Sequence, residues 1–266
     1  MPDRTAVIAG TGALPPLIVA ALDTPAVFAP EGVAVGVPAQ PFRLERLVPL
    51  LDRLIDDGVR RVVFAGGVRR PRLDPQIFDS RTATLLPRIL GAIQSGDDAA
   101  LRELIAIFEE WGLTVVGVQD ILPELVPDAG LLAGDPGPAD RRDADRAAQI
   151  LSEIGALDIG QGAVVVQGLC LAVETLPGTD AMLEFAARHA HLRPDPAGSR
   201  GVFYKAPKPG QDLRIDLPTL GPDSVAAAAR AGLAGIAWQA SGVILLDRPA
   251  MIEAAVATGL FLWARG

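Results

Sequence analysis

Short apolar runs rich in β-branched residues alternate with stretches of helical spacing along this chain, and this alternation restricts the fold more than any other feature. Residues 5–9 (TAVIA) and 61–65 (RVVFA) are typical of buried strands. Between them, leucine and isoleucine recur at helical spacing from Leu44 to Ile55, and Gly58 supplies a stop. Strands that alternate with helices predict an α/β fold with mostly parallel strands.

The alternation continues to the C-terminus with one interruption. The patterns predict helices at 97–112, 139–154, 180–189, 223–231 and 249–258, and strands at 113–118, 163–167, 169–174, 201–206, 242–247 and 260–264. Prolines and glycines between residues 123 and 138 disfavour a regular element. Because 266 residues suffice for two domains of ordinary size, we predict a boundary there, with α/β domains at 1–130 and 131–266.

Composition excludes several classes of function. A formal net charge of −8 argues against nucleic acid as a partner, because binding to phosphate backbones needs a basic face. The single cysteine, Cys170, lies in an apolar run and is expected to be buried, so no disulfide framework can form. The apolar N-terminus is interrupted at Gly10, Gly12 and Pro15 and lacks the features of a secretion signal. We therefore expect a cytoplasmic protein, with association to a membrane surface left open.

Glycine-rich turns follow both of the first clear strands. Gly10 and Gly12 come after the first, where backbone N–H groups can approach a phosphate at a helix N-terminus. A tight turn explains them equally well, and a dinucleotide site is disfavoured because Pro15 stands where the fingerprint has a third glycine. Gly66 and Arg69 follow the second strand, at the edge of a parallel sheet where ligands collect. Both turns are candidate substrate-binding loops.

Polar residues lie at the ends of two nearly continuous apolar strands in the second half. Asp158 and Gln161 precede the first of these strands, and Glu174, Thr179 and Asp180 follow the second. Thr179 or Asp180 could simply cap the next helix. Beside a phosphate, the same residues would instead donate and accept hydrogen bonds or hold a metal ion.

The stretch YKAPKPGQDLRIDLPTLG, residues 204–221, holds the only two lysines of the chain, Lys205 and Lys208. Its prolines prevent a helix, so polar side chains are displayed from extended backbone; besides the lysines these are Gln211, Arg214, Asp216 and Thr219. Three cations beside a carboxylate suit phosphoryl chemistry, in which cations neutralise oxygen charge and a carboxylate holds Mg²⁺ or orients water. An ammonium is a compact donor that a guanidinium does not replace, which favours function over a merely solvated loop.

This motif, together with DIGQGAVVVQGLCLAVETLPGTDAML, IAGTGALP, FAGGVRRP and GDDAALR, resembles the LpxI family of UDP-2,3-diacylglucosamine pyrophosphatases along almost the whole chain. The resemblance implies a two-domain enzyme of lipid A biosynthesis in Gram-negative bacteria that works at the inner membrane. It implies Mg²⁺-dependent hydrolysis to UMP and 2,3-diacylglucosamine 1-phosphate, with the lipid in a cleft between the domains. The catalytic aspartate of the family's R-x-D-L-P-T motif corresponds to Asp216, whereas Gly67 stands where a polar residue is expected.

The resulting hypothesis gives each candidate residue a role. Asp216, with Glu174 or Asp180, would hold Mg²⁺ on the diphosphate, while Lys205, Lys208 and Arg214 stabilise charge. The remaining candidates are substrate-binding residues: Gly10, Gly12, Gly66, Arg69, Gln161, Thr179, Gln211 and Thr219. Two alternatives remain, a Rossmann-type nucleotide-dependent oxidoreductase and a non-catalytic protein that binds a lipid or nucleotide. The sequence also leaves open whether the chain forms a homo-oligomer.

Overall fold

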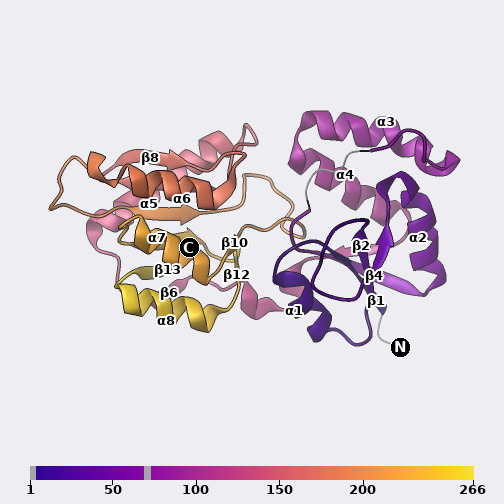
Figure 1. Ribbon diagram of the computed structural model, residues 1–266, viewed down its shortest axis with the longest axis horizontal. Coiled ribbons are helices and arrows are strands. Elements are labelled where there is room, and N and C mark those ends of the chain that lie inside the picture. The colour runs from indigo at the N-terminus through magenta and orange to yellow at the C-terminus, as the bar shows by residue number, and fades with distance from the viewer. Residues whose placement is uncertain (1–3, 69–72) are drawn as a thin grey trace. The chain divides into compact units, whose positions relative to one another are not determined.

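The computed structural model describes residues 4–68 and 73–266, and the chain divides into two compact units (Figure 1). The N-terminal unit contains the residues up to Pro123 together with Asp212–Asp216. The C-terminal unit contains Glu124–Gln211 and Leu217–Gly266. The expected architecture of two α/β domains is confirmed. The boundary, however, falls after Pro123 instead of residue 130, and five residues of the 204–221 motif belong to the N-terminal unit.

Within the described residues, the N-terminal unit is built on a five-stranded parallel sheet of strand order β3-β2-β1-β4-β5. Its elements are β1 (Arg4–Ala9), α1 (Leu14–Ala21), β2 (Ala26–Pro30), β3 (Gln40–Phe42), α2 (Leu47–Asp56), β4 (Val59–Ala65), α3 (Ser80–Ser95), α4 (Asp97–Glu110) and β5 (Thr114–Val116), with short 3₁₀ helices at Leu44–Arg46 and Val118–Asp120. This strand order matches the Rossmann-like sheet that the sequence predicted.

Alternation of side chains along the strands decides which helices cover this sheet. Ala6 and Ile8 of β1 point to the same face and share a buried cluster with residues of α2 and α4, such as Leu51 and Phe108. The leucines of α2 recur at helical spacing, so one side of this helix is buried and the other exposed. Ile215, which is far away in the sequence, lies in the same buried cluster. The N-terminal core is therefore completed by a residue from the later motif.

The C-terminal unit carries a six-stranded mixed sheet of order β6-β13-β11-β9-β7-β8 and a two-stranded sheet, β10-β12, within the described part of the chain. Its elements are a 3₁₀ turn at Pro123–Leu125, β6 (Gly130–Ala133), α5 (Pro138–Gly155), β7 (Gly162–Val166), β8 (Leu169–Val173), α6 (Gly178–Arg188), a 3₁₀ turn at Ala190–Leu192, β9 (Val202–Lys205), β10 (Thr219–Leu220), α7 (Pro222–Arg230), β11 (Gly235–Gln239), β12 (Ile244–Leu245), α8 (Arg248–Thr258) and β13 (Phe261–Arg265).

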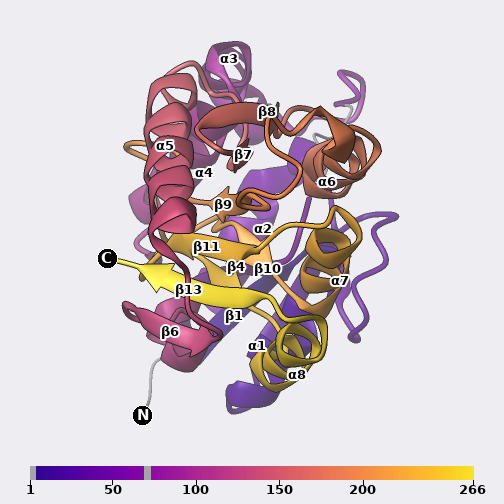
Figure 2. The same cartoon turned by 90° about the vertical axis from the view of Figure 1, so that its left-hand side faces the viewer.

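Helices cover both faces of the six-stranded sheet, which makes three layers. Figure 2 shows α5 on one side of the sheet and α6, α7 and α8 on the other. Ala163 and Val165 of β7 pack in the cluster that includes α5, whereas Val164 and Val166 pack in the cluster that includes α6, α7 and α8. Because both faces are covered, the central strands are apolar throughout and lack the alternating pattern of a half-exposed sheet.

Several details differ from the sequence-based predictions, which gave no strand at Gly235–Gln239, where β11 lies between β13 and β9. A strand, β6, lies in the stretch that was expected to be irregular, where it pairs antiparallel with β13 at the sheet edge. The strand expected at 242–247 is shorter, only Ile244–Leu245. Cys170, which was expected to be buried, is exposed because β8 is the other edge strand of the sheet.

No helix in residues 4–68 or 73–266 combines the length and the apolar composition that crossing a bilayer requires.

Candidate functional site

In the N-terminal unit, the loops after β1 and β4 meet at the carboxyl edge of the sheet. The chain leaves β1 toward β2 on one side, while β4 lies on the other side of β1. This is the topological switch point, where loops diverge and ligands of doubly wound sheets collect. The candidate residues Gly10, Gly12 and Gly66 all lie in these two loops. Arg69 falls outside the described residues.

Two of these glycines are required by the way the loops pack. Thr11 and Gly67 form an isolated bridge, in which Thr11 N–H donates to the Gly67 carbonyl at 2.8 Å and Gly67 N–H donates to the Thr11 carbonyl at 3.0 Å. A Cβ on Gly10 would lie 2.5 Å from the Gly67 oxygen, and a Cβ on Gly66 would lie 2.5 Å from the Thr11 oxygen. Gly66 also has a φ of +92°. Close backbone approach therefore explains Gly10 and Gly66 without a ligand.

Gly12 differs from these two glycines. Its φ is +101°, it is exposed, and a Cβ on it would meet no atom within 4 Å. The open space beside Gly12 leaves its backbone accessible, directly before the start of α1. Of the three glycines, Gly12 is the one that best suits the predicted ligand-binding loop.

A hollow of about 510 Å³ lies beside the same edge, in the loop that connects β2 to β3. It is lined by Ala29, Pro30, Gly32, Val33, Ala34, Val35, Gly36, Val37, Pro38, Ala39 and Pro41. These residues carry no charged side chain, so polar contacts inside the hollow would come from backbone groups. A Cβ on Gly36 would lie 3.7 Å from Pro16, which places this loop against the first turn of α1.

In the C-terminal unit, a buried lysine connects the ends of three elements. Lys205, at the end of β9, is 5% exposed. Its ammonium donates to the Thr179 hydroxyl at 2.5 Å, in the first turn of α6. The Glu174 carboxylate, directly after β8, lies 3.7 Å from the same ammonium. The structure thus brings together three of the predicted site residues.

The space for Glu174 depends on glycines. A Cβ on Gly162 would lie 2.7 Å from Glu174 Oε2, and a Cβ on Gly160 would lie 2.1 Å from the Glu174 carbonyl oxygen. Oε2 itself is buried and accepts no hydrogen bond from the residues that the structure describes. Removing one partner of an ion pair at this burial would be costly, because the remaining charge would stay buried without compensation. The GQG sequence at 160–162 therefore supports the Lys205–Glu174 pair sterically.

A second group of polar contacts involves residues close in sequence to the Lys205–Glu174 pair. Lys208 forms an ion pair with Asp158, and Gln161 donates from Nε2 to Gln211 Oε1 at 3.0 Å. The same Gln211 oxygen accepts the Lys208 N–H at 3.0 Å. Gln161 and Gln211 therefore hold the turn that carries Lys208.

The two remaining candidates of the C-terminal unit make fewer contacts with this group. Asp180 lies in the first turn of α6, directly after Thr179, where a carboxylate interacts favourably with the helix dipole. The Thr219 hydroxyl, at the start of β10, donates to the Leu217 carbonyl at 3.4 Å. The helix dipole accounts locally for Asp180, and turn formation accounts for Thr219.

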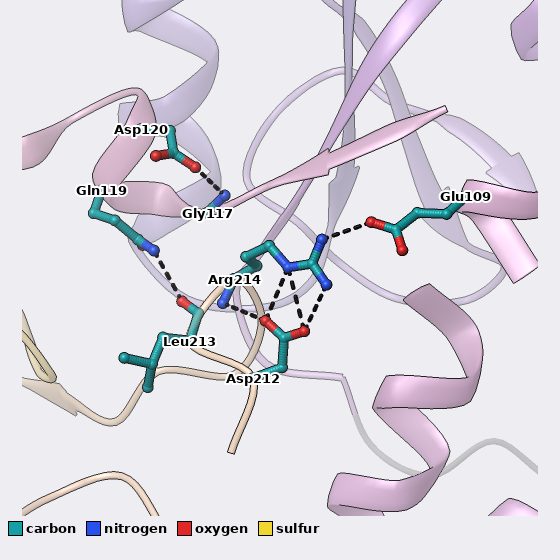
Figure 3. A network of polar contacts seen from close by, with 7 residues as sticks. All are labelled: Glu109, Gly117, Gln119, Asp120, Asp212, Leu213 and Arg214. Carbon is teal, nitrogen blue, oxygen red and sulfur yellow. Dashed lines mark hydrogen bonds and ion pairs between the residues drawn. The ribbon is translucent and has the colours of Figure 1, made fainter. Parts of the chain in front are cut away.

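The segment Asp212–Asp216 of the N-terminal unit forms a separate network, which Figure 3 shows from close by. Arg214 donates from Nε and Nη2 to the Asp212 carboxylate, at 3.0 Å and 2.7 Å, and from Nη1 to Glu109 of α4 at 2.6 Å. Gln119 Nε2 donates to the Leu213 carbonyl at 3.2 Å. Asp212, Glu109 and Gln119 were not among the residues predicted from the sequence. Asp212 could have been found from the D-L-R sequence, which places it two residues before Arg214. No local pattern indicates Glu109 or Gln119.

These contacts fix the charge states of the pair. The hydrogen bonds from the Arg214 guanidinium hold the pKa of the Asp212 carboxyl below its usual value, and the same carboxylate raises the pKa of Arg214. Asp212 is therefore ionised at neutral pH. Arg214 was expected to act as a cation on the substrate, but its three donor nitrogens already contact two carboxylates.

Asp216 follows this network directly. It is exposed, whereas Ile215 and Leu217 on either side are buried. Its φ of +57° lies in the left-handed region, which is uncommon for residues other than glycine. Aspartate adopts this region more readily than most other residues, and here it does so between two buried neighbours.

The three carboxylates proposed as metal ligands differ in how well they suit Mg²⁺. Glu174 already faces an ammonium, which competes with a divalent cation for its charge. Asp180 and Asp216 are oxygen donors of the kind that Mg²⁺ prefers. Among residues 4–68 and 73–266, no three acidic, histidine or cysteine side chains come together as a ready cation site. Since Mg²⁺ is commonly held by one or two carboxylates plus substrate phosphates, the residues present fit that mode.

Both units thus present glycine loops or charged side chains at the ends of their strands, which defines a two-domain α/β protein with candidate ligand sites at the sheet edges. Comparison with known proteins gives the family. Residues 4–125 match the LpxI N-terminal domain, and residues 128–263 match the LpxI C-terminal domain. The UDP-2,3-diacylglucosamine pyrophosphatase LpxI of Caulobacter vibrioides is 44% identical over 208 residues, which cover 77% of this chain and 74% of that relative. The chain belongs to the LpxI family.

Proposed function

We propose that this protein hydrolyses the diphosphate bond of UDP-2,3-diacylglucosamine, releasing UMP and 2,3-diacylglucosamine 1-phosphate in lipid A biosynthesis. The observation that carries the proposal is the family match along both domains, together with a pyrophosphatase relative that shares 44% of its residues over most of both chains. This match favours the pyrophosphatase over the Rossmann-type oxidoreductase. Pro15, at the first turn of α1, occupies the place of the third glycine of a dinucleotide fingerprint.

Asp216 is proposed as the catalytic carboxylate. Its support is its exposure between two buried residues and its correspondence to the aspartate of the R-x-D-L-P-T motif. A carboxylate in this position would orient the attacking water and accept its proton.

Lys205 and Lys208 are proposed as the cations of the C-terminal unit. Each already contacts a carboxylate, Glu174 or Asp158, which fixes the position of its ammonium. Positioned cations stabilise the charge that develops on phosphoryl oxygens better than mobile ones do, because they need no reorganisation during the reaction. Gln161, Thr179, Gln211 and Thr219 would orient these groups and the substrate by hydrogen bonds.

Mg²⁺ is proposed as the cofactor, held by the substrate phosphates and one carboxylate, for which Asp216 of the N-terminal unit and Asp180 of the C-terminal unit are separate candidates. When bound to the diphosphate, the ion would neutralise part of its negative charge. Glu174 is then better described as the partner of Lys205 than as a metal ligand, because the two side chains lie 3.7 Å apart with little exposure to water.

The nucleotide half of the substrate is proposed to bind at the carboxyl edge of the N-terminal sheet. The accessible backbone beside Gly12 and the start of α1 suit a phosphate, and the uncharged hollow in the β2–β3 loop suits an uncharged base. The diacylated sugar would partition into a lipid surface. We therefore propose that the protein works on the cytoplasmic side of the inner membrane as a peripheral protein.

The test is UMP release from UDP-2,3-diacylglucosamine, measured with and without Mg²⁺. Wild type should release UMP, and Asp216→Ala should be slower by roughly a hundredfold or more. Asp223→Ala, which alters an exposed aspartate in the first turn of α7, is the matched control and should retain activity. Folded wild type that releases no UMP would refute the pyrophosphatase, whereas full activity in Asp216→Ala would refute only the role of that residue.

A further inference from the structure

The segment Asp212–Asp216 belongs to the N-terminal unit although the chain on both sides of it belongs to the C-terminal unit. Five residues cannot form a helix or sheet of their own that would hold them there. Their position must therefore depend on contacts with residues of the first 123.

One of these contacts is apolar. Ile215 is 6% exposed and lies in the buried cluster that contains Leu51 of α2 and Phe108 of α4. Burial of an isoleucine side chain contributes a stabilisation that does not depend on direction, so it anchors the segment without fixing its orientation.

Two polar contacts supply the orientation. The Arg214 guanidinium bridges Asp212 within the segment and Glu109 on α4, as Figure 3 shows. On the other side of the segment, Gln119 donates to the Leu213 carbonyl. A guanidinium that binds a carboxylate with two nitrogens is restricted in angle as well as in distance. These two contacts, from α4 and from the 3₁₀ helix Val118–Asp120, together fix Asp212, Leu213 and Arg214, and the buried Ile215 connects them to Asp216.

The position of the Gln119 side chain requires a glycine at position 117. A Cβ on Gly117 would lie 2.4 Å from the Gln119 amide. Gly117 has an ordinary φ of −83°, so its requirement is steric and not conformational. Gly117 N–H also donates to Asp120 Oδ2 at 2.8 Å, which closes this turn around the glutamine.

The charges argue that Arg214 supports Asp216 and does not bind the substrate. Its guanidinium serves two carboxylates, so the local sum of the three charges is negative. An anionic diphosphate that approached the guanidinium would be repelled by the two carboxylates beside it.

We infer that Glu109 and Gln119 are positioning residues, which act through Arg214 and Leu213 to hold the Asp212–Asp216 segment so that Asp216 acts from the N-terminal unit. The inference rests on the proposed function for the role of Asp216, but the holding of the segment can be measured without turnover. Arg214 is then a positioning residue too.

The chain provides a closely matched control for Glu109. Glu110, the next residue on α4, also forms an ion pair with an arginine, accepting from both terminal nitrogens of Arg88 on α3. Glu109→Gln and Glu110→Gln therefore remove the same charge from the same helix end, and each breaks one arginine pair. They differ in that only Glu109 contacts the Asp212–Asp216 segment.

The experiment measures UMP release and amide hydrogen exchange in wild type, Glu109→Gln, Gln119→Leu and Glu110→Gln. Glu109→Gln and Gln119→Leu should lower kcat roughly tenfold and leave KM within about twofold, because the reacting group is misplaced while substrate contacts remain. The amides of Arg214 and Ile215, which donate to Asp212, should exchange faster in both variants. Glu110→Gln should change neither quantity.

Variants of Arg214 separate positioning from substrate binding. If Arg214 positions the segment, Glu109→Gln combined with Arg214→Gln should be no slower than Arg214→Gln alone, and Arg214→Lys should recover part of kcat. A large rise in KM for Arg214→Gln, with unchanged or higher kcat for Glu109→Gln, would overturn the inference. If wild type releases no UMP, the proposed function fails. Unchanged exchange in Glu109→Gln would then still overturn the positioning role.

Discussion

The two units present their strand ends in different ways. At the carboxyl edge of the N-terminal sheet, loops pack through backbone atoms, and Gly10 and Gly66 leave no room for a Cβ. At the corresponding edge of the C-terminal sheet, side chains join the strand ends, because Lys205 contacts Glu174 and Thr179. One edge depends on the absence of side chains and the other on their charges.

The two edges should therefore tolerate different changes. A backbone-built edge is sensitive to added volume and insensitive to pH and salt, because its hydrogen bonds join neutral groups. An edge built on a buried ion pair is sensitive to loss of either charge, because the remaining partner stays buried without compensation. The comparison can therefore be tested by substitutions that alter volume in one unit and charge in the other.

The largest effect is expected for Lys205→Met. This change keeps most of the volume but leaves Glu174 buried opposite an apolar side chain, which should lower the free energy of unfolding of the C-terminal unit by about 3–5 kcal/mol. Chemical denaturation monitored by circular dichroism measures this loss. Adding Glu174→Gln to Lys205→Met should restore part of the stability.

Lys208→Met is the control for this prediction. The ion pair of Lys208 with Asp158 is more exposed, with side-chain exposures of 16% and 32%. Its loss should cost only about 1 kcal/mol. Equal losses for the two lysine variants would contradict the view that burial of the Lys205–Glu174 pair distinguishes this edge.

A smaller effect is expected for Gly66→Ala in the N-terminal unit. The new Cβ would lie 2.5 Å from the Thr11 oxygen, at a φ of +92°. Overpacking and backbone strain together should lower the free energy of unfolding by about 2–3 kcal/mol. Gly12→Ala has a similar φ but open space, and should cost about 1 kcal/mol. If the two alanine variants were equally stable, close packing of the loops would not be the reason for Gly66.

The smallest effect concerns pH. Arg214 lowers the pKa of folded Asp212 below its unfolded value, so Asp212 contributes stability above the unfolded value, and this contribution is lost as pH falls through the folded pKa. Below about pH 4, the N-terminal unit should lose less than about 1 kcal/mol through this residue. Denaturation of wild type and Asp212→Asn from pH 6 to pH 3 measures the difference. The two proteins should converge in stability at the acidic end, and a constant gap would exclude this explanation.

The elements that the sequence predicted well are those with a strong internal pattern. The helices α2, α4 and α5 and the strands β1, β4 and β7 are long or continuously apolar, so their local pattern and their tertiary environment agree. β6 was missed because it is a mostly exposed edge strand in a stretch rich in glycine and proline, and its pairing with β13 is a tertiary property. Cys170 was misjudged because an apolar run does not reveal that its strand lies at an edge.

In the candidate site too, contacts that follow from the local pattern could be predicted and contacts that depend on tertiary structure could not. Contacts among residues that flank neighbouring strands, such as Lys205 with Glu174 and Thr179, could be anticipated because strand ends converge at a sheet edge. The bridge from Arg214 to Glu109 could not, because the two residues are separated by most of a domain in sequence. Tertiary contacts such as those of Ile215 decide which unit binds a short irregular segment. The local sequence pattern does not predict these contacts.

The position of Ile215 has a consequence for dividing this protein into parts. A fragment that ends at Pro123 would contain every strand of the five-stranded sheet but would lack the isoleucine that completes its core. Such a fragment would expose an unfilled apolar cavity to water, which favours aggregation or loose packing. The reverse fragment would carry Ile215 as an exposed apolar residue on an unattached loop. Recombination or duplication of one half alone would separate Ile215 from the core that it completes. The two halves are therefore expected to be inherited together.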